Sequence, residues 1–459
     1  MKRRVHFIGI GGAGISAIAR VMFERGEIVK GSDRAESVYT TGLREAGIEV
    51  MIDHRPENVS GADLVIASSA IPDDNPEMVA ARASGIPVFS RKEFLGELTA
   101  NSQTVAVAGT HGKSTTSGMI AWILERAGQR PTFIVGAVLA DLGTNAGAGD
   151  GPHFVIEADE YEEAFLGLEP SVAVVTNVEH DHPDCFPSPE DFHNVFVAFT
   201  ARVQDLLVVC LDDRGASSLE RAGLERLTYG LGEGAQWRAD ALRANDEGGM
   251  DFQLHCEGQT LGPVRNLLPG EHNVRNSLAA LAVVDFLGVP LETAVHALAA
   301  YHGVQRRFQV LGRAQGVIMI DDYAHHPTEI ISTLAGARRH YPQAEIWAVF
   351  QPHTFSRTKT LLDDLARAFG DADHVIVLDV FAAREKPDPE ITGEIVARRI
   401  DHADVRHISG LVETTAYLIE NVTTGSVVIS LSAGDGNQVV LGLLDELQSR
   451  GMEDEDGDQ

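Results

Sequence analysis

Two glycine-rich loops, each directly after a short apolar run, constrain this chain more than any other feature. The first loop spans residues 9–14 after the run 5–8, and the second spans residues 109–115 after the run 105–108. A glycine-rich turn between a strand and a helix lets backbone amides approach a phosphate at the positive end of the helix. Two such units predict parallel sheets covered by helices, and a protein that brings two phosphorylated ligands together.

Length, charge and cysteine content limit the possible classes. A chain of 459 residues is too long for one hydrophobic core, and 44% apolar residues are ordinary for a globular protein. The net charge of −30 would repel a nucleic-acid backbone or an anionic membrane, so we expect neither as a partner. Three scattered cysteines, no secretory pattern at the N-terminus and no apolar run of about 18 residues indicate a cytoplasmic location.

Short apolar runs alternate with helical patterns almost throughout, which divides the chain into three α/β units with boundaries near residues 104 and 306. A more irregular stretch near 227–261 is predicted to be antiparallel. The predicted strands are 5–8, 27–30, 64–67 and 87–89 in the first unit, 104–108, 132–135, 153–157, 172–176 and 206–210 in the second, and 316–320, 346–350, 374–380 and 427–431 in the third.

Polar clusters follow strand after strand. In open α/β sheets the ligand site lies at the carboxyl ends of the strands, so we expect these clusters to meet there. Two of them, 321–327 and 351–358, supply carboxylate, imidazole and guanidinium groups suited to a zwitterionic amino acid. Besides the two glycine loops, the clusters are 68–69, 157–160, 177–184, 321–327, 351–358, 383–385 and 432–437.

The first loop has the spacing Gly9-x-Gly11-x-x-Gly14 and opens a helix, so its amides can approach a diphosphate. Asp33 lies 19 residues past Gly14, where a carboxylate binds a ribose hydroxyl. Taken alone, the motif favours NAD. The spacing does not say which diphosphate the loop holds.

The second loop differs from the usual P-loop because Gly112 comes three positions after Gly109. Its chemistry survives, since Lys113 can reach phosphate oxygens and the Ser114 hydroxyl can bind Mg²⁺, so we predict ATP binding. Three further groups fit this reading: Glu157 and His182 as metal ligands after successive strands, and Arg307 as an arginine that stabilises a transferring phosphoryl group. Taken singly, Glu157 would be read as a capping acid, His182 as a histidine whose hydrogen bonds the fold satisfies, and Arg307 as a surface arginine.

These residues together resemble the Mur ligases over essentially the whole length of the chain. Within that family, the chain is most similar to the members that join L-alanine to UDP-N-acetylmuramate. The set is specific because it comprises nine motifs in a fixed order. The motifs are 9–16, 68–71, 109–115, 157–160, 181–182, 269–276, 306–309, 321–328 and 351–358.

The resemblance implies an α/β fold of three domains. A Rossmann-like domain (1–103) would bind the UDP-sugar, so that the first loop holds UDP rather than NAD. A central P-loop ATPase-type α/β domain (104–305) would bind ATP, and a C-terminal Rossmann-like α/β domain (306–459) would close over ATP and bind the amino acid. The implied cofactors are ATP and Mg²⁺, and the implied assembly is a monomer or homodimer.

The resemblance also implies a role for each motif residue. Lys113, Glu157, His182 and Arg307 would be catalytic, and Ser114, Glu157 and His182 would bind the metal. The UDP-sugar would contact Gly9, Gly11, Gly12, Gly14, Ser16, Asp33, Ser68 and Ser69. ATP would contact Gly109, Thr110, His111, Gly112, Lys113, Ser114, Thr115, Asn273, Asn276, Arg307 and Asp322. The amino acid would contact Tyr323, His325 and Arg357.

The chain departs from the family pattern at two places. Tyr161 and Glu162 follow the acidic motif where many members have serine and aspartate, as in the recycling ligase that attaches a whole tripeptide to the same sugar nucleotide. Thr354 stands where many members have arginine. The tripeptide ligase therefore stays as an alternative, beside an NAD-dependent oxidoreductase fused to an ATPase and a non-catalytic nucleotide sensor.

Overall fold

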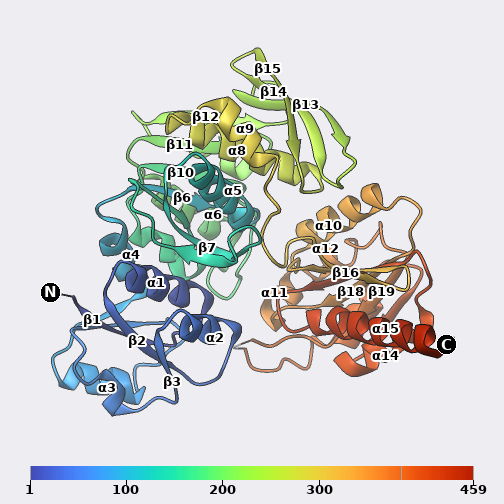
Figure 1. Ribbon diagram of the computed structural model, residues 1–459, viewed down its shortest axis with the longest axis horizontal. Helices are drawn as coiled ribbons and strands as arrows, with labels where there is room; N and C mark the ends of the chain where they lie inside the picture. The colour runs from blue at the N-terminus through green and yellow to red at the C-terminus, as the bar shows by residue number, and fades with distance from the viewer. Residues whose placement is uncertain (1, 384, 458–459) are drawn as a thin grey trace.

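The computed structural model describes residues 2–383 and 385–457, and it contains three α/β domains, each built on its own sheet. In Figure 1 the first domain is at the lower left, the second at the top and the third at the right. The expected fold class is confirmed. Within the described ranges, no helix combines the length and apolar character that crossing a membrane requires.

The first domain has a five-stranded parallel sheet in the order β3-β2-β1-β4-β5. The four-residue edge strand β3 was not predicted, because only Val50 of its four residues is buried and no apolar run marks it. The strands are β1 (Arg4–Ile8), β2 (Ile28–Asp33), β3 (Glu49–Ile52), β4 (Leu64–Ala67) and β5 (Val88–Ser90), and the helices are α1 (Ala13–Glu24), α2 (Val38–Glu45), η1 (Pro56–Val59), α3 (Pro76–Ala83) and α4 (Arg91–Thr99).

The second domain has a ten-stranded sheet in the order β15-β14-β13-β12-β11-β10-β6-β9-β7-β8. Its centre is parallel, and the predicted antiparallel stretch corresponds to β13, β14 and β15. The strands are β6 (Gln103–Ala108), β7 (Thr132–Leu139), β8 (Thr144–Gly147), β9 (His153–Glu157), β10 (Val172–Val175), β11 (Leu206–Cys210), β12 (Glu225–Gly230), β13 (Trp237–Ala244), β14 (Met250–Cys256) and β15 (Gln259–Asn266).

Helices pack on both faces of this sheet, and α5 lies against α8 and α9 on one of them. Helix α5 is buried along most of its length, from Ser114 to Leu124. Such burial fixes the P-loop that precedes it. The helices of the domain are α5 (Lys113–Arg126), η2 (Tyr161–Gly167), α6 (Pro189–Thr200), α7 (Arg214–Ser217), α8 (Glu271–Phe286) and α9 (Leu291–Leu298).

The third domain has a six-stranded sheet in the order β16-β17-β21-β18-β19-β20, parallel except at β16. The edge strands β16 and β20 were not predicted because neither contains an apolar run. The elements are β16 (Gln309–Ala314), β17 (Val317–Asp322), α10 (Pro327–His340), β18 (Ile346–Gln351), α11 (Phe355–Thr360), α12 (Leu362–Leu365), β19 (His374–Val377), α13 (Gly393–Arg399), β20 (Val405–His407), α14 (Leu411–Asn421), β21 (Val427–Ser432) and α15 (Asn437–Gly457).

Two hydrophobic clusters sandwich the third sheet, one under α10 and α13 and the other under α14 and α15. The helix α10 starts at the carboxyl end of β17 and reaches the second domain at both of its own ends. Glu329 in its first turn lies 3.2 Å from His111 of the P-loop, and Arg339 in its last turn lies 3.1 Å from Glu271. This helix therefore carries a contact between the third domain and the loop 109–115, and Figure 1 shows α10 on the side of the third domain that faces the second.

Candidate active site

The second glycine loop is shaped by close packing from neighbouring elements. Gly109 and Gly112 both have positive φ, at +135° and +80°. A Cβ at Gly109 would lie 2.0 Å from Thr176 Oγ1, and a Cβ at Gly112 would lie 2.7 Å from Asn276 Oδ1. Glycine is therefore required at both positions, by backbone conformation and by space.

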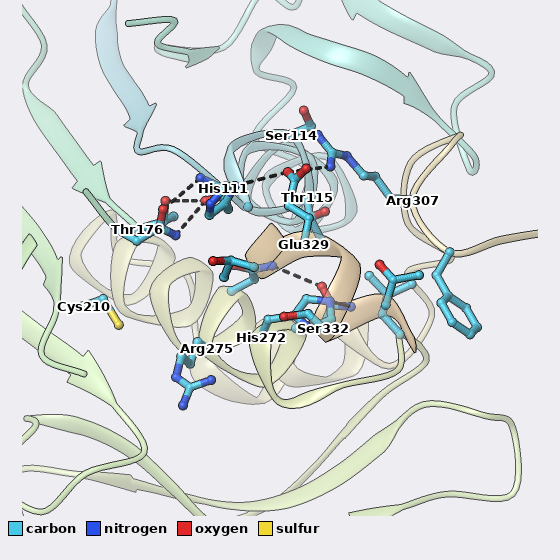
Figure 2. Close-up of a pocket in the computed structure, with 18 of the residues that line it drawn as sticks. His111, Ser114, Thr115, Thr176, Cys210, His272, Arg275, Arg307, Glu329 and Ser332 are labelled. Atoms are coloured by element: carbon cyan, nitrogen blue, oxygen red, sulfur yellow. Dashed lines mark hydrogen bonds and ion pairs between the residues drawn. The ribbon is translucent and has the colours of Figure 1, made fainter. Parts of the chain in front are cut away.

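A cavity of about 310 Å³ opens at this loop, between the second and third domains. Figure 2 shows His111 and Ser114 on the loop side, with Arg307 and Glu329 facing them from the third domain. Eight of the expected ATP residues line it: His111, Gly112, Ser114, Thr115, Asn273, Asn276, Arg307 and Asp322. Lining residues that sequence reasoning missed include Thr176, Glu179, Asp212, His272, Arg275 and Glu329.

His111 connects the two domains that form the cavity. Its Nε2 lies 2.9 Å from Glu179 Oε2 in the second domain, and its Nδ1 lies 3.2 Å from Glu329 Oε1 in the third. Burial opposes a charge on this ring, but the hydrogen bonds to the two carboxylates raise the pKa of His111 to about 9. The imidazole is therefore protonated at neutral pH and holds the domains together.

Lys113 is paired with Glu160 rather than with Glu157. Its Nζ donates to Glu160 Oε1 at 2.9 Å and to the carbonyl oxygens of Gly109 and Thr110 in its own loop. Glu160 is 1% exposed. Burial raises the pKa of Glu160 to about 7, although Lys113 acts in the opposite direction. The signal in the sequence was the third and last acid of the motif 157–160.

The expected metal ligands do not contact one another directly. Ser114 lines the cavity, whereas Glu157 Oε2 accepts a hydrogen bond from the Gly136 amide at 2.6 Å. His182 Nε2 lies 3.8 Å from Glu160 Oε1 and 3.7 Å from Asp181 Oδ2, so Glu160 is the acid of the motif 157–160 that lies beside the imidazole. Glu160 Oε2 is buried without a hydrogen-bond partner. A hydroxyl, an imidazole and an unsatisfied carboxylate oxygen form a donor set that fits a divalent cation.

Another group of possible ligands, His111, Glu179 and His326, has its ligand atoms within 4.8 Å of one another. Burial lowers the pKa of His326, so its ring is neutral. His111, however, is protonated and donates from both ring nitrogens, to Glu179 and to Glu329. The geometry here is that of a hydrogen-bonded contact between domains.

The first glycine loop is braced by the strand beside it. The amides of Gly9 and Ile10 both donate to the Ser32 carbonyl oxygen, at 2.8 and 2.9 Å, and the Gly11 amide donates to Asp33 Oδ2 at 2.8 Å. Asp33 therefore shapes the loop, in addition to the ribose contact expected of it.

The other residues expected at the sugar nucleotide differ in accessibility. The Ser16 hydroxyl donates to the Ala13 carbonyl within its own helix, and Ser16 is buried. Ser68 packs under the loop, since a Cβ on Gly9 would lie 3.0 Å from its Cβ. Ser69 and Gly12 are both exposed. Of the two serines at the end of β4, Ser69 is the more accessible to a ligand.

Arg91 links the two glycine loops, and sequence reasoning missed it. It is the first residue of α4, and its guanidinium lies against Gly14, where a Cβ would be 2.9 Å from Arg91 Cζ. The same guanidinium donates to Asp159 Oδ2 at 2.9 Å. Asp159 precedes Glu160, the partner of Lys113. A continuous series of contacts thus runs from the first loop to the P-loop lysine.

The three residues expected at the amino acid lie close together in the third domain. The guanidinium carbons of Arg306 and Arg307 lie 5.1 and 5.2 Å from the centre of the Tyr323 ring, and the rings of Tyr323 and His325 are 5.5 Å apart. Burial, with Arg357 adding to it, lowers the pKa of His325 to about 3. This ring is therefore neutral at physiological pH.

Arg357 is bound to the second domain. Its Nε and Nη2 donate to the Asp181 carboxylate at 2.6 and 3.2 Å, and the residue is 5% exposed. A bidentate arginine–carboxylate pair is the geometry in which an arginine holds the carboxylate of an amino acid. In this structure the carboxylate that Arg357 holds is that of Asp181.

Asp322, expected at the ATP ribose, uses both oxygens within its own domain. They accept from the amides of Phe308 and Ala324, at 2.7 and 2.8 Å. Burial raises the pKa of Asp322 to about 6. Asp322 lines the cavity wall while it fixes the segment that carries Arg307.

This fold and site define a three-domain P-loop enzyme in which a third α/β domain closes the nucleotide cavity. Family models match the chain as Mur ligase family, catalytic domain (residues 4–103), Mur ligase middle domain (107–284) and Mur ligase, glutamate ligase domain (306–434). The chain belongs to the Mur ligase family.

Individual relatives extend this similarity over almost the whole chain. A UDP-N-acetylmuramate–L-alanine ligase of Sorangium cellulosum is 42% identical, with 98% of this chain and 97% of the relative covered. A crystal structure of the UDP-N-acetylmuramate-alanine ligase from Thermotoga maritima superposes with a TM-score of 0.83 at 29% identity, covering 98% of this chain and 100% of that one.

A ligase of a whole peptide is also similar. The UDP-N-acetylmuramate:L-alanyl-γ-D-glutamyl-meso-diaminopimelate ligase from Neisseria meningitides has a TM-score of 0.61 at 29% identity, covering 67% of this chain and 100% of that one. The proteins similar to this chain therefore include ligases named for L-alanine and a ligase named for a tripeptide.

Proposed function

We propose that this protein joins L-alanine to the lactyl carboxylate of UDP-N-acetylmuramate at the expense of ATP. The observation that carries the proposal is the series of contacts from Gly14 through Arg91 and Asp159 to Glu160 and Lys113. This series connects the two glycine loops, which supports a diphosphate and a triphosphate bound at one junction. The 42% identity to an L-alanine ligase supports the choice of substrates.

The three domains divide the substrates among them. Residues 1–103 bind the UDP-sugar through the first loop, with Gly11 and Asp33 at the diphosphate and ribose. Residues 104–305 bind ATP through the P-loop and the asparagines of α8. Residues 306–459 close the cavity with Arg307 and present Tyr323, His325 and Arg357 to the amino acid.

In the first step a lactyl carboxylate oxygen attacks the γ-phosphorus of ATP. The bond to the β–γ bridging oxygen breaks, and an acyl phosphate and ADP result. Lys113 leaves Glu160 and, with Arg307, neutralises the charge on the transferred group. A Mg²⁺ ion, held by Ser114, His182 and a carboxylate of the motif 157–160, would supply further charge neutralisation at the phosphate oxygens.

In the second step the alanine amine attacks the acyl carbon, loses a proton, and inorganic phosphate leaves. The acyl phosphate must be kept from water during this time. Contacts between the second and third domains at His111, Glu179 and Glu329 close the cavity on that side. Catalysis is therefore mainly positioning and charge neutralisation.

The deciding test is phosphate release from ATP with UDP-N-acetylmuramate and one amine at a time. We expect L-alanine to give the highest kcat/KM among L-alanine, L-serine, glycine and the tripeptide. A preference for the tripeptide would assign the chain to the recycling reaction. ATP binding without phosphate release for any amine would contradict the ligase function altogether.

A further inference from the structure

In this structure the ammonium group of the P-loop lysine is already paired with oxygens of the protein. Lys113 Nζ contacts three oxygens, the carbonyls of Gly109 and Thr110 and the carboxylate of Glu160. Its side chain is only 14% exposed. The ammonium must leave Glu160 before it can reach the phosphates of ATP.

Glu160 differs from the other acids of its motif. Glu157 accepts from the Gly136 amide, and the two oxygens of Asp159 accept from Arg91 and from the Tyr161 amide. Glu160 has one oxygen on Lys113 and one buried oxygen without a hydrogen-bond partner. A buried carboxylate oxygen left unsatisfied is costly, which indicates a site that another group completes.

A second ligand lies beside this carboxylate. His182 Nε2 is 3.8 Å from Glu160 Oε1, and His182 Nδ1 lies 3.3 Å from Arg357 Nη2. The arginine therefore faces one nitrogen of the ring, while the other, Nε2, lies near Glu160 and also 3.7 Å from Asp181 Oδ2, a carboxylate that is itself paired with Arg357. A carboxylate and an imidazole nitrogen at this spacing are suitable ligands for a divalent cation.

We propose that Glu160 exchanges one cation for another during the reaction. Without nucleotide it holds Lys113 away from the phosphate site. When Lys113 turns to the phosphates of ATP, Glu160 and His182 take up a divalent cation. The proposal rests on the ATP-binding part of the proposed function and adds Glu160 both as a positioning residue for Lys113 and as a metal ligand.

The exchange follows from electrostatics. An ammonium and a divalent cation on the same buried carboxylate repel each other strongly, because little water screens them. The metal therefore binds weakly while Lys113 occupies Glu160 and tightly after nucleotide withdraws the lysine. Because the position of Lys113 controls metal affinity, the metal binds tightly only when ATP is present.

The test is Mn²⁺ binding to the full chain without nucleotide, measured from the EPR signal of free Mn²⁺. Lys113→Met removes the competing ammonium, and we expect it to tighten Mn²⁺ binding by about tenfold or more. The double variant Lys113→Met with Glu160→Gln should lose this gain. Lys113→Gln provides a second removal of the charge if the first variant does not fold by circular dichroism.

Two controls locate the effect. Glu162→Gln makes the same change at an exposed position two residues away and should keep the gain when combined with Lys113→Met. Glu157→Gln, combined with Lys113→Met, should also keep the gain, which distinguishes the Glu157 carboxylate from that of Glu160. The proposal is overturned if removing the Lys113 charge does not tighten Mn²⁺ binding, or if the gain survives Glu160→Gln.

Neither the sugar nucleotide nor an amino acid enters this experiment. Failure of the cation exchange would therefore leave the ligase reaction standing. Conversely, absence of phosphate release in the enzymatic assay would leave the Mn²⁺ result unchanged.

Discussion

The two glycine loops of this protein are supported in opposite ways. The first is braced almost entirely within its own domain, by the Ser32 carbonyl and the Asp33 carboxylate. The P-loop is tied to elements far away in the sequence: Asn177 accepts from the His111 amide, and Glu329 reaches His111 from the third domain. The contacts of the first loop thus lie within one domain, whereas those of the second include a contact from the third domain.

The pKa values of the ionisable groups behind the two loops are also shifted in opposite directions. Under the first loop, burial acts to raise the pKa of Glu77, but hydrogen bonds from His6, Ser32 and Asn58 prevail and bring it to about 2. At the P-loop, carboxylates raise the pKa of His111 to about 9. Acid therefore weakens the support of the first loop, and alkali weakens the support of the second.

The largest effect is expected at the P-loop lysine. Lys113→Ala removes the cation that neutralises the transferred phosphoryl group, so phosphate release should fall by about a thousandfold or more. Glu160, whose pKa is about 7, can take up a proton in place of its lost partner, so the fold should survive. Steady-state phosphate release and circular dichroism measure the two outcomes. Near-normal turnover in this variant would refute the assignment of the loop.

The next effect tests the brace under the first loop. Because its pKa is depressed from 4.5 to about 2, ionised Glu77 contributes about 3 kcal/mol at neutral pH. This contribution is present above pH 4.5 and disappears as the pH falls through 2. Urea unfolding of the wild type and Glu77→Gln should therefore differ by that amount at pH 7 and converge in acid.

A constant difference between wild type and Glu77→Gln across this pH range would mean that the carboxylate charge is not what supports the loop. Glu57→Gln is a suitable control, because Glu57 is exposed in the same domain.

The contrast between the loops also explains what the sequence could predict. Local features were accessible: the first loop, its Asp33 and the P-loop glycines lie within short segments whose spacing determines their shape. Arg91, Glu160 and Glu329 were missed as site residues because their partners, Asp159, Lys113 and His111, belong to other segments or domains. A single sequence carries no record of such pairings.

Glu157 follows its strand, and its role as a metal ligand stays a prediction, while Glu160 is the acid that lies beside Lys113 and His182. Strands with buried apolar runs were found. The edge strands β3, β16 and β20 were not, because tertiary pairing rather than local pattern creates them.

A smaller effect is expected where α10 meets the P-loop. Glu329→Gln removes a charged partner of both His111 and Arg307, and the loss of such charge-assisted hydrogen bonds should lower kcat/KM for ATP by tenfold to about a hundredfold. The pKa of His111 should also fall from about 9, since one of the two carboxylates that raise it is gone. An NMR titration of the His111 ring measures this directly.

The other end of α10 offers a matched control for this variant. Glu271→Gln breaks the ion pair with Arg339, which joins the same two domains but is about half exposed, and exposed pairs contribute little. An equal loss of kcat/KM in both variants would show that domain docking in general matters, rather than the contact with the P-loop.

The smallest effect separates the two loops functionally. Asp33→Ala removes the acceptor of the Gly11 amide and leaves the P-loop contacts untouched, so KM for the UDP-sugar should rise by about tenfold while KM for ATP stays constant. Asp74→Ala, at an exposed position in the same domain, should change neither constant. If Asp33→Ala raised both KM values equally, the first loop would also depend on domain closure, and the distinction between a locally braced loop and one shared between domains would fail.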